Sequence, residues 1–251
     1  MKRYIKKLWL KPIYLTFLIA LSCLGTFSWE VQAQSNSIYT NKKNQVTFEP
    51  PKGDKPQQTV GGASRGEQCP LDSQEIDLPI TPLLPVSSQA LTVKSHPTLL
   101  VYLPKTSANK VYFAVRDENE DYDYQTILPV KTSAGIASFT LPKDAPELSM
   151  EKQYQWSLIL MCDGKLRPDS PVAKGNIKRV VANAYMTQKL PNSDLLESAA
   201  IYGQAGIWYD TVADLAQLKM TQPNNDGVSA NWKNLLIQAG LGKVAKAELV
   251  E

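Results

Sequence analysis

The chain has 251 residues, 43% of them hydrophobic, with 27 basic residues, 24 acidic residues and one histidine. This length is sufficient for one hydrophobic core with an appendage, and a single histidine excludes a zinc site built from several histidines. Residues 1–33 hold five basic residues and one acidic residue, so the rest of the chain has 22 basic and 23 acidic residues and a net charge of −1. The charge therefore gives no support to nucleic-acid binding.

Residues 1–33 have the pattern of a cleaved signal peptide. A basic start precedes the apolar run Ile13–Phe27, and the small-residue site Val31–Ala33 follows. The apolar run is shorter than the roughly 20 residues that span a bilayer, so no transmembrane helix is expected after cleavage. Lipid attachment at Cys23 is an alternative, for which Ala20–Ser22 is a poor match. We predict an exported protein of the periplasm, the cell surface or the extracellular medium.

Residues 34–60 form a polar leader rich in Asn, Gln, Lys and Pro. Within it, Gln45–Glu49 alternates in the way expected of an edge strand. Gly61–Cys69 contains three glycines, which allow a tight turn. We interpret this stretch as a loop that delivers Cys69 to its partner, because it lacks the glycine spacing and the lysine of a phosphate-binding loop.

Two cysteines, Cys69 and Cys162, lie outside the predicted signal peptide. An even number of cysteines in an oxidising compartment predicts a disulfide, and two separate buried thiols are the alternative. Cys162 ends the stretch Tyr154–Cys162, in which large hydrophobic residues occur at every second position. In a strand these side chains share one face, so this stretch is predicted to be central to the core.

Residues 61–181 contain short runs typical of strands, separated by turn residues. This spacing favours an antiparallel β-sandwich of the immunoglobulin-like or fibronectin-like type. The predicted strands are Thr98–Leu103, Lys110–Arg116, Tyr124–Val130, Ile136–Leu141, Lys152–Cys162 and Val172–Val181.

Residues 182–251 are predicted to form a helical tail. Asp194 precedes an amphipathic stretch as a helix cap, and further helices are expected over Ile207–Lys219 and Val228–Ala239. Gly206 and Gly240 are 34 residues apart, a spacing similar to that of tetratricopeptide repeats. The tail is either a surface that recruits a partner or a cap that packs on the sheets.

Three aromatic residues of the tail, Trp208, Tyr209 and Trp232, are candidates for binding a partner. The alternative is that they are core residues.

An acidic turn supplies oxygen ligands at every second position, namely Asp117, Asn119, Asp121 and Asp123. Tyr122 and Leu128 occupy the positions that an EF-hand reserves for glycine and glutamate, which excludes that motif. The two remaining interpretations are a weak calcium site and a solvated turn.

The sequence contains no convincing catalytic set. His96 lies just before a strand, and no Gly-x-Ser-x-Gly motif accompanies it. Two Ser-x-x-Lys matches, beginning at Ser107 and Ser149, lack the partner motifs that a penicillin-binding serine needs. We therefore interpret His96 as a histidine at the surface or at a strand edge and expect no cofactor.

Five stretches carry a family resemblance: Gly61–Cys69, His96–Pro104, Gly135–Ile136, Tyr154–Cys162 and Gly175–Val180. Together they resemble a cyanobacterial family of exported proteins that is catalogued as a domain of unknown function, nine-two-eight. The similarity covers about Val46–Glu251, and it implies an exported β-domain without an assigned activity.

These observations favour an exported, non-enzymatic binding or scaffolding protein of the cell envelope. Its expected partner is another envelope protein or a surface glycan. The alternative is an envelope hydrolase that acts on glycan or peptide through scattered carboxylates, which sequence alone does not place.

Overall fold

The structure is a computed structural model of the chain and describes residues 45–51, 68–72, 78–86, 90–119 and 121–250. The predicted signal peptide, most of the polar leader and Gly61–Gly66 lie outside these residues. No helix in the described ranges has the length and apolar character needed to cross a membrane.

The first sheet has four strands in the order β1-β3-β6-β9. Its main pair is β3 with β6, which run antiparallel from Thr98 opposite Thr140 to Leu103 opposite Gly135. A parallel partner, β9, joins β6 from the end of the described chain. The strands are β1 (Thr81–Pro82), β3 (Thr98–Leu103), β6 (Gly135–Thr140) and β9 (Leu249–Val250).

The second sheet has five strands in the order β2-β8-β7-β4-β5. Its middle strand, β7, carries the alternating residues that the sequence singled out, and Tyr154, Trp156, Leu158 and Leu160 are all buried. The strands are β2 (Leu91–Thr92), β4 (Lys110–Asp117), β5 (Asp123–Pro129), β7 (Gln153–Leu160) and β8 (Val172–Arg179).

Both sheets are mixed, which corrects the prediction of a purely antiparallel arrangement. The long strands pair antiparallel, but β2 joins β8 and β9 joins β6 in parallel. These short strands have two residues each, too few to show a sequence period. The mainly β architecture followed by helices is confirmed, whereas the immunoglobulin-like or fibronectin-like sandwich type stays a prediction.

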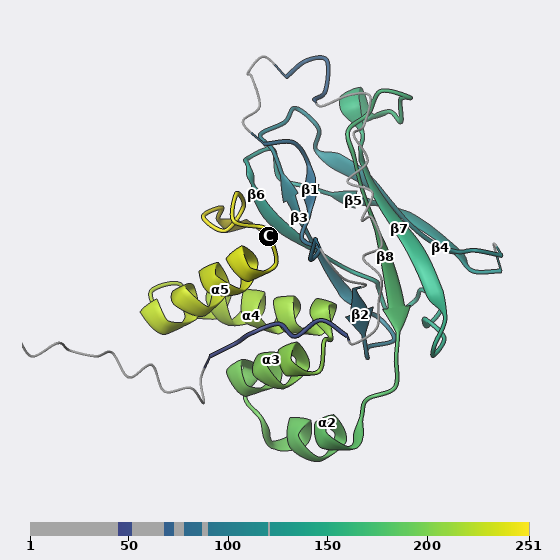
Figure 1. The fold of residues 1–251 in the computed structure, drawn as a ribbon. Coiled ribbons are helices and arrows are strands. Elements are labelled where there is room, and N and C mark those ends of the chain that lie inside the picture. Colours follow the sequence, from purple (N-terminus) through teal and green to yellow (C-terminus); the bar gives the residue numbers. More distant parts are fainter. Residues whose placement is uncertain (1–44, 52–67, 73–77, 87–89, 120, 251) are drawn as a thin grey trace, which may run out of the picture. The chain divides into compact units, whose positions relative to one another are not determined.

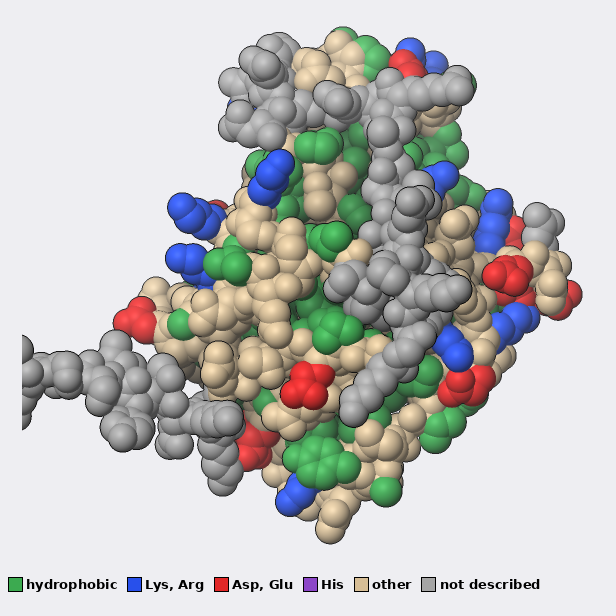
Figure 2. All heavy atoms as spheres, viewed as in Figure 1, with side chains coloured by type: hydrophobic (Ala, Val, Ile, Leu, Met, Phe, Trp, Pro, Cys, Tyr) green, Lys and Arg blue, Asp and Glu red, His purple; other side chains and the backbone are tan. Residues whose placement is uncertain are grey.

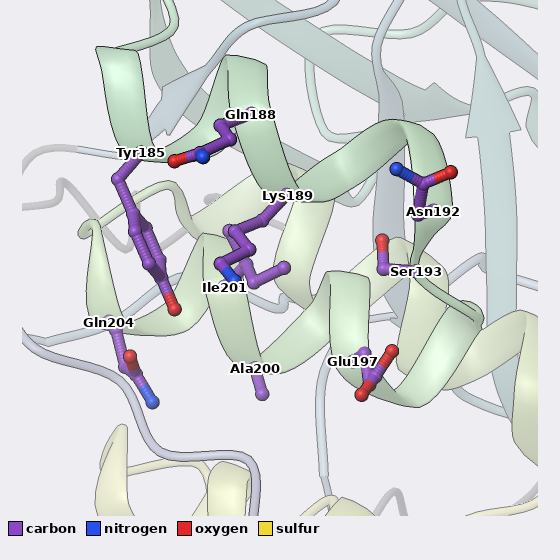
Figure 3. A pocket seen from close by; sticks show the side chains of 9 residues that line it. All are labelled: Tyr185, Gln188, Lys189, Asn192, Ser193, Glu197, Ala200, Ile201 and Gln204. Atoms are coloured by element: carbon purple, nitrogen blue, oxygen red, sulfur yellow. The ribbon is translucent and has the colours of Figure 1, made fainter.

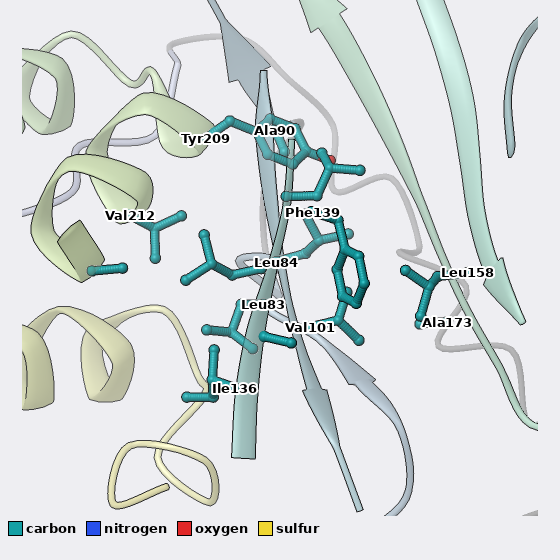
Figure 4. Packing of buried hydrophobic residues seen from close by; sticks show 14 of the residues in the cluster. Leu83, Leu84, Ala90, Val101, Ile136, Phe139, Leu158, Ala173, Tyr209 and Val212 are labelled. Atoms are coloured by element: carbon teal, nitrogen blue, oxygen red, sulfur yellow. The ribbon is translucent and has the colours of Figure 1, made fainter. Parts of the chain in front are cut away.

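Strand β3 is buried on both faces. Leu99 lies against Phe113 and Trp156 of the second sheet, whereas Leu100 lies near α4 (Trp208–Thr221). Figure 4 shows the same division, with Phe139 on the side of Leu158 and Val212 on the helical side. One hydrophobic core therefore includes side chains of both sheets and of the helices.

The C-terminal helices lie on the side of the first sheet that faces away from the second sheet (Figure 1). They are α2 (Ala184–Lys189), α3 (Leu195–Gln204), α4 and α5 (Asp226–Gln238), with the short 3₁₀ turn η3 (Leu190–Asn192) between α2 and α3. A separate turn, η2 (Cys162–Gly164), follows β7 of the second sheet. We call α3–α5 the helical layer. Its central member, α4, contacts α3, α5, β2 and β3.

Helix boundaries agree closely with the local signals. Asp194 caps α3 as predicted, since its Oδ1 accepts hydrogen bonds of 2.9 Å from the backbone N–H groups of Leu196 and Glu197. Gly206 and Gly240 follow α3 and α5 with φ values of +75° and +81°. Both helices thus end at a glycine in the left-handed conformation, and these two ends are 34 residues apart. The similarity to tetratricopeptide repeats stays a prediction.

The disulfide between Cys69 and Cys162 is present, as predicted, with the two Cα atoms 5.4 Å apart. Both cysteines are buried, and the bond ties the segment 68–72 to the end of β7. It closes a long loop, because the two cysteines are 93 residues apart.

Replacing both cysteines, by Cys69→Ala and Cys162→Ala together, is expected to lower the free energy of unfolding by about 2–5 kcal/mol, because the unfolded chain regains the entropy of the open loop. Urea unfolding of the variant and of the reduced native protein should give similar losses. Equal stability of the variant and the oxidised native protein would contradict a stabilising role for this bond.

Candidate functional site

An extended segment of the chain, residues 45–51, lies across the helical layer and is named the leader segment here (Figure 1, dark purple). Gln238 of α5 contacts both backbone groups of one leader residue. Its Oε1 accepts a hydrogen bond from the Phe48 N–H, and its Nε2 donates one to the Phe48 carbonyl, each at 3.0 Å. We call the residues of the helical layer that contact the leader segment the leader-binding surface.

Two further backbone groups of the leader segment find partners on this surface. The Val46 N–H donates to Asn231 Oδ1 at 2.7 Å, and the Glu49 N–H donates to the Gly203 carbonyl at 2.9 Å. Asn231 and Gln238 are seven residues apart on α5, so they lie on one face of that helix. We refer to these two side chains as the amide clamp.

Alternate side chains of the leader segment enter the core. Val46 and Phe48 are 1% and 4% exposed, whereas Gln45 and Glu49 are exposed. The Phe48 ring meets the Trp208 ring edge to face, with 5.0 Å between centroids. Burying a side chain such as phenylalanine contributes roughly 1.5–3 kcal/mol.

The close approach of the leader segment depends on a missing side chain in α3. A Cβ atom on Gly203 would overlap the Thr47 carbonyl oxygen, and one on Gly206 would lie 2.9 Å from the Glu49 carbonyl oxygen. Backbone therefore packs directly on backbone at the end of α3.

The position of the leader segment corrects the prediction of an edge strand over Gln45–Glu49. The alternation of Val46 and Phe48 was a correct sign of an extended, half-buried segment. It pairs with helix side chains instead of a sheet edge, because Asn231 and Gln238 satisfy the backbone groups that a neighbouring strand would satisfy. Amide residues two turns apart on a predicted helix were the available signal.

The three aromatic residues that are candidates for binding a partner are all buried, as the alternative of core residues implies. Trp208, Tyr209 and Trp232 are 0%, 2% and 1% exposed. The Trp208 indole N–H donates to the Leu83 carbonyl at 2.7 Å. The Trp208 ring contacts the Phe48 ring of the leader segment, so Trp208 is a buried member of the leader-binding surface.

Tyr209 links α4 to the second sheet. Its hydroxyl accepts a hydrogen bond from the Trp156 indole N–H at 2.7 Å and donates one to the Asn176 carbonyl at 2.8 Å. Tyr209 thus contributes a buried polar connection between the helical layer and strands β7 and β8.

A buried carboxylate follows directly in the sequence. Asp210 is 1% exposed, and its Oδ2 accepts hydrogen bonds from Thr92 Oγ1 at 2.9 Å and from the Val93 N–H at 3.0 Å. Lys94 Nζ lies 3.5 Å from Asp210 Oδ1. Burial raises the pKa of Asp210 against the opposing effect of Lys94 and of the two hydrogen-bond donors.

Asp214 lies one turn further along α4 and shares Lys94. Lys94 Nζ is 3.2 Å from Asp214 Oδ1, and Ser198 Oγ donates to Asp214 Oδ2 at 2.5 Å. Burial lowers the pKa of Lys94, but the two carboxylates outweigh it and raise that pKa overall. Lys94 and Asp214 line a hollow of about 360 Å³ between α4 and strands β3 and β6, whereas Asp210 does not line it.

The predicted calcium ligands lie at the tip of the β4–β5 hairpin. Asp117 is buried, accepts a hydrogen bond from the Tyr122 N–H at 3.1 Å and forms an ion pair with Lys152. Asp123 forms an ion pair with Arg116 at 2.9 Å. Two of the carboxylates therefore already have cationic partners. Asn119 and Asp121 are exposed.

In the described part of the chain, no three His, Cys, Asp or Glu side chains come together as metal ligands. Calcium binding by the acidic turn stays a prediction.

His96 has local partners for both ring nitrogens. Nε2 lies 3.0 Å from the Ala145 carbonyl oxygen, and Nδ1 lies 3.1 Å from Ser95 Oγ. This arrangement fits a histidine that orders the loop before β3.

Comparisons with known proteins add a family but no activity. A family model described as "Domain of Unknown Function (DUF928)" matches residues 60–249. No curated protein matches the chain. One similar solved structure is titled "Crystal Structure of a family 76 glycoside hydrolase from a bovine Bacteroides thetaiotaomicron strain", with a TM-score of 0.24 and 11% sequence identity. The match covers 67% of this chain and 37% of that enzyme, and at this TM-score it carries no argument.

The raised pKa of Asp210 predicts a specific dependence of stability on pH. The folded protein retains a proton on Asp210 that the unfolded chain releases near pH 3.8. The contribution of Asp210 to the free energy of unfolding is therefore complete below that pH, and it is lost as the pH rises through the higher pKa of the folded state. Urea unfolding between pH 3 and 7 should show the native protein losing stability, relative to Asp210→Asn, as the pH rises. Parallel curves for the two proteins would show that the pKa of this carboxyl is not raised.

Proposed function

Because the chain belongs to the family described as Domain of Unknown Function (DUF928), whose name states no activity, we propose a function from the geometry. The protein is an exported, non-enzymatic binding or scaffolding protein of the cell envelope. Its leader-binding surface recognises an extended peptide segment, and residues 45–51 of its own chain are the resident occupant.

The observation that carries this proposal is the contact of Gln238 with both backbone groups of Phe48. Every non-proline peptide unit offers the same N–H and carbonyl, so the amide clamp recognises an extended backbone regardless of side chains. Selectivity comes from the buried sites of Val46 and Phe48, which favour apolar side chains at alternate positions. Main-chain hydrogen bonds with pockets for alternate side chains are a general mode of peptide recognition.

The occupant that we propose in addition to the leader segment is an extended segment of an envelope partner protein, with apolar residues two positions apart. The leader segment is part of the same chain, so its binding is intramolecular, and effective concentrations of linked segments can reach the order of millimolar. A partner segment must compete with it. The leader segment therefore limits binding to partners that are concentrated or tightly matched.

The face of the molecule that carries the leader segment shows no broad apolar patch among the described residues, which fits a binding site that is already occupied. Figure 2 shows that hydrophobic side chains of the described residues reach the surface of this face in small separate groups among polar atoms. One large aromatic residue that could recruit a partner, Trp208, is instead buried and in contact with Phe48 of the leader segment.

Export to an oxidising compartment is supported by two observations. Residues 1–33 have the composition of a signal peptide, and the Cys69–Cys162 disulfide is of the kind that persists outside the cytosol. We interpret the two sheets, which share one core, as a β-sandwich framework that carries the helical layer. The helix ends at Gly206 and Gly240 support a repeat-like relation between its two halves.

The alternative function, hydrolysis of glycan or peptide, has one supporting observation, which is the hollow lined by Lys94 and Asp214. A pair of carboxylates working on one substrate would have to face the same cavity. Asp210 lies outside the lining of this hollow, and its Oδ2 accepts hydrogen bonds from Thr92 at the end of β2 and from the Val93 N–H. We therefore favour the binding function.

Peptide binding in trans tests the proposal. Phe48→Ser in the full mature chain removes the main apolar contact of the leader segment, so a labelled synthetic peptide of residues 45–51 should bind to the variant with saturable fluorescence anisotropy. The unaltered chain should bind it weakly, because its own segment occupies the surface. Adding Gln238→Ala should weaken binding about tenfold, since two hydrogen bonds to the peptide backbone are lost.

Gln217→Ala is the matched control, because Gln217 is an exposed glutamine on α4 that makes no hydrogen bond to the described residues of the leader segment. It should leave peptide binding unchanged, and circular dichroism should confirm that each variant is folded. Absence of binding to the folded Phe48→Ser variant, or equal binding with and without Gln238, would reject the proposal.

A further inference from the structure

A second hollow, of about 610 Å³, lies between α2, the turn η3 and α3. Figure 3 shows its side chains coming from all three elements, with Tyr185 extending from α2 toward the end of α3 that carries Gln204. Its size falls within the roughly 300–1,000 Å³ typical of small-molecule sites. This hollow is formed by different residues from those of the amide clamp.

The hollow combines an apolar floor with a polar rim. Ala200 and Ile201 are buried at its floor, and Tyr185 is 50% exposed beside it. Gln188, Asn192 and Gln204 are exposed, and within the described residues their side chains have no hydrogen-bond partner. Polar groups without partners around an apolar floor are available to a ligand.

The charges in the hollow select against a strongly charged ligand. Lys189 and Glu197 are its two ionised side chains among the described residues, and their charges cancel. A phosphate or sulfate group is usually bound by several cations, above all arginine, and the lining contains no arginine. A neutral ligand fits this balance better than an anion or a cation.

The rim chemistry matches hydroxyl groups. Each side-chain amide offers both a donor and an acceptor, and a sugar hydroxyl also donates and accepts. The amide group of Gln188, Asn192 or Gln204 can therefore donate to one hydroxyl of a sugar ring and accept from the adjacent hydroxyl. Tyr185 presents a flat apolar ring face, against which the C–H face of a sugar ring can pack, while its hydroxyl stays in water.

We propose that this hollow is a binding site for a neutral saccharide, which packs on Tyr185 and is hydrogen-bonded by Gln188, Asn192 and Gln204. The site is independent of the leader-binding surface. If both are present, the helical layer brings a polysaccharide and a protein segment together, as a scaffold of the envelope would.

The test is isothermal titration of the full mature protein with three neutral hexasaccharides, namely cellohexaose, maltohexaose and hexa-N-acetylchitohexaose. A heparin-derived hexasaccharide serves as an anionic probe of similar length. We expect saturable binding of at least one neutral probe and none of the anionic probe. Tyr185→Ala and Gln204→Ala should each weaken that binding about tenfold or more, the effect of losing one well-packed or hydrogen-bonded group.

Ile237→Ala is the matched control, because Ile237 is 52% exposed on α5 and does not line the hollow. It should bind as the unaltered protein does. Absence of binding to all three neutral probes, preference for the anionic probe, or binding that survives Tyr185→Ala would each overturn the proposal. Because the ligand is a saccharide, failure here is distinguishable from failure of peptide binding at the leader-binding surface.

Discussion

The start of α4 is attached to the sheets by three consecutive side chains, and the position of the whole helical layer depends on this attachment. Trp208 donates to the Leu83 carbonyl, Tyr209 connects Trp156 with the Asn176 carbonyl, and Asp210 accepts from the loop after β2. The two indole hydrogen bonds are buried and the other two are partly buried, so breaking a buried one leaves a polar group without a partner at a cost of about 1–3 kcal/mol. Helices α3 and α5 then pack on α4 and acquire fixed positions.

This fixed position allows the helical layer to bind an extended segment. The amide clamp needs α5 at a defined distance from the end of α3, because Gln238 binds Phe48 while the Gly203 carbonyl binds the next residue. The same segment inserts Phe48 against Trp208, so one aromatic side chain both attaches α4 to the sheets and receives the leader segment. The same cluster around Trp208 thus attaches α4 to the sheets and binds the leader segment. A partner segment would therefore meet a preformed surface.

Local patterns predicted the features that depend on local physics. The alternation in Tyr154–Cys162 identified the central strand, Asp194 identified a helix start, and the two remaining cysteines identified the disulfide. The parallel pairings of β2 and β9 and the location of the leader segment depend on residues far apart in the sequence, so no local period records them. Trp208, Tyr209 and Asp210 are consecutive and all buried, which an amphipathic helix with one buried face does not predict.

Amide hydrogen exchange of the leader segment tests the central claim, which is that the helical layer binds an extended backbone. The account predicts slow exchange at Val46, Phe48 and Glu49, and an increase of about tenfold or more in Gly203→Ala, whose new methyl group displaces the Thr47 carbonyl. Gly242→Ala is the control, because its Cβ atom would meet only Ile237 at an ordinary 3.7 Å. Exchange at unprotected rates in the native protein, or full protection in Gly203→Ala, would contradict the account.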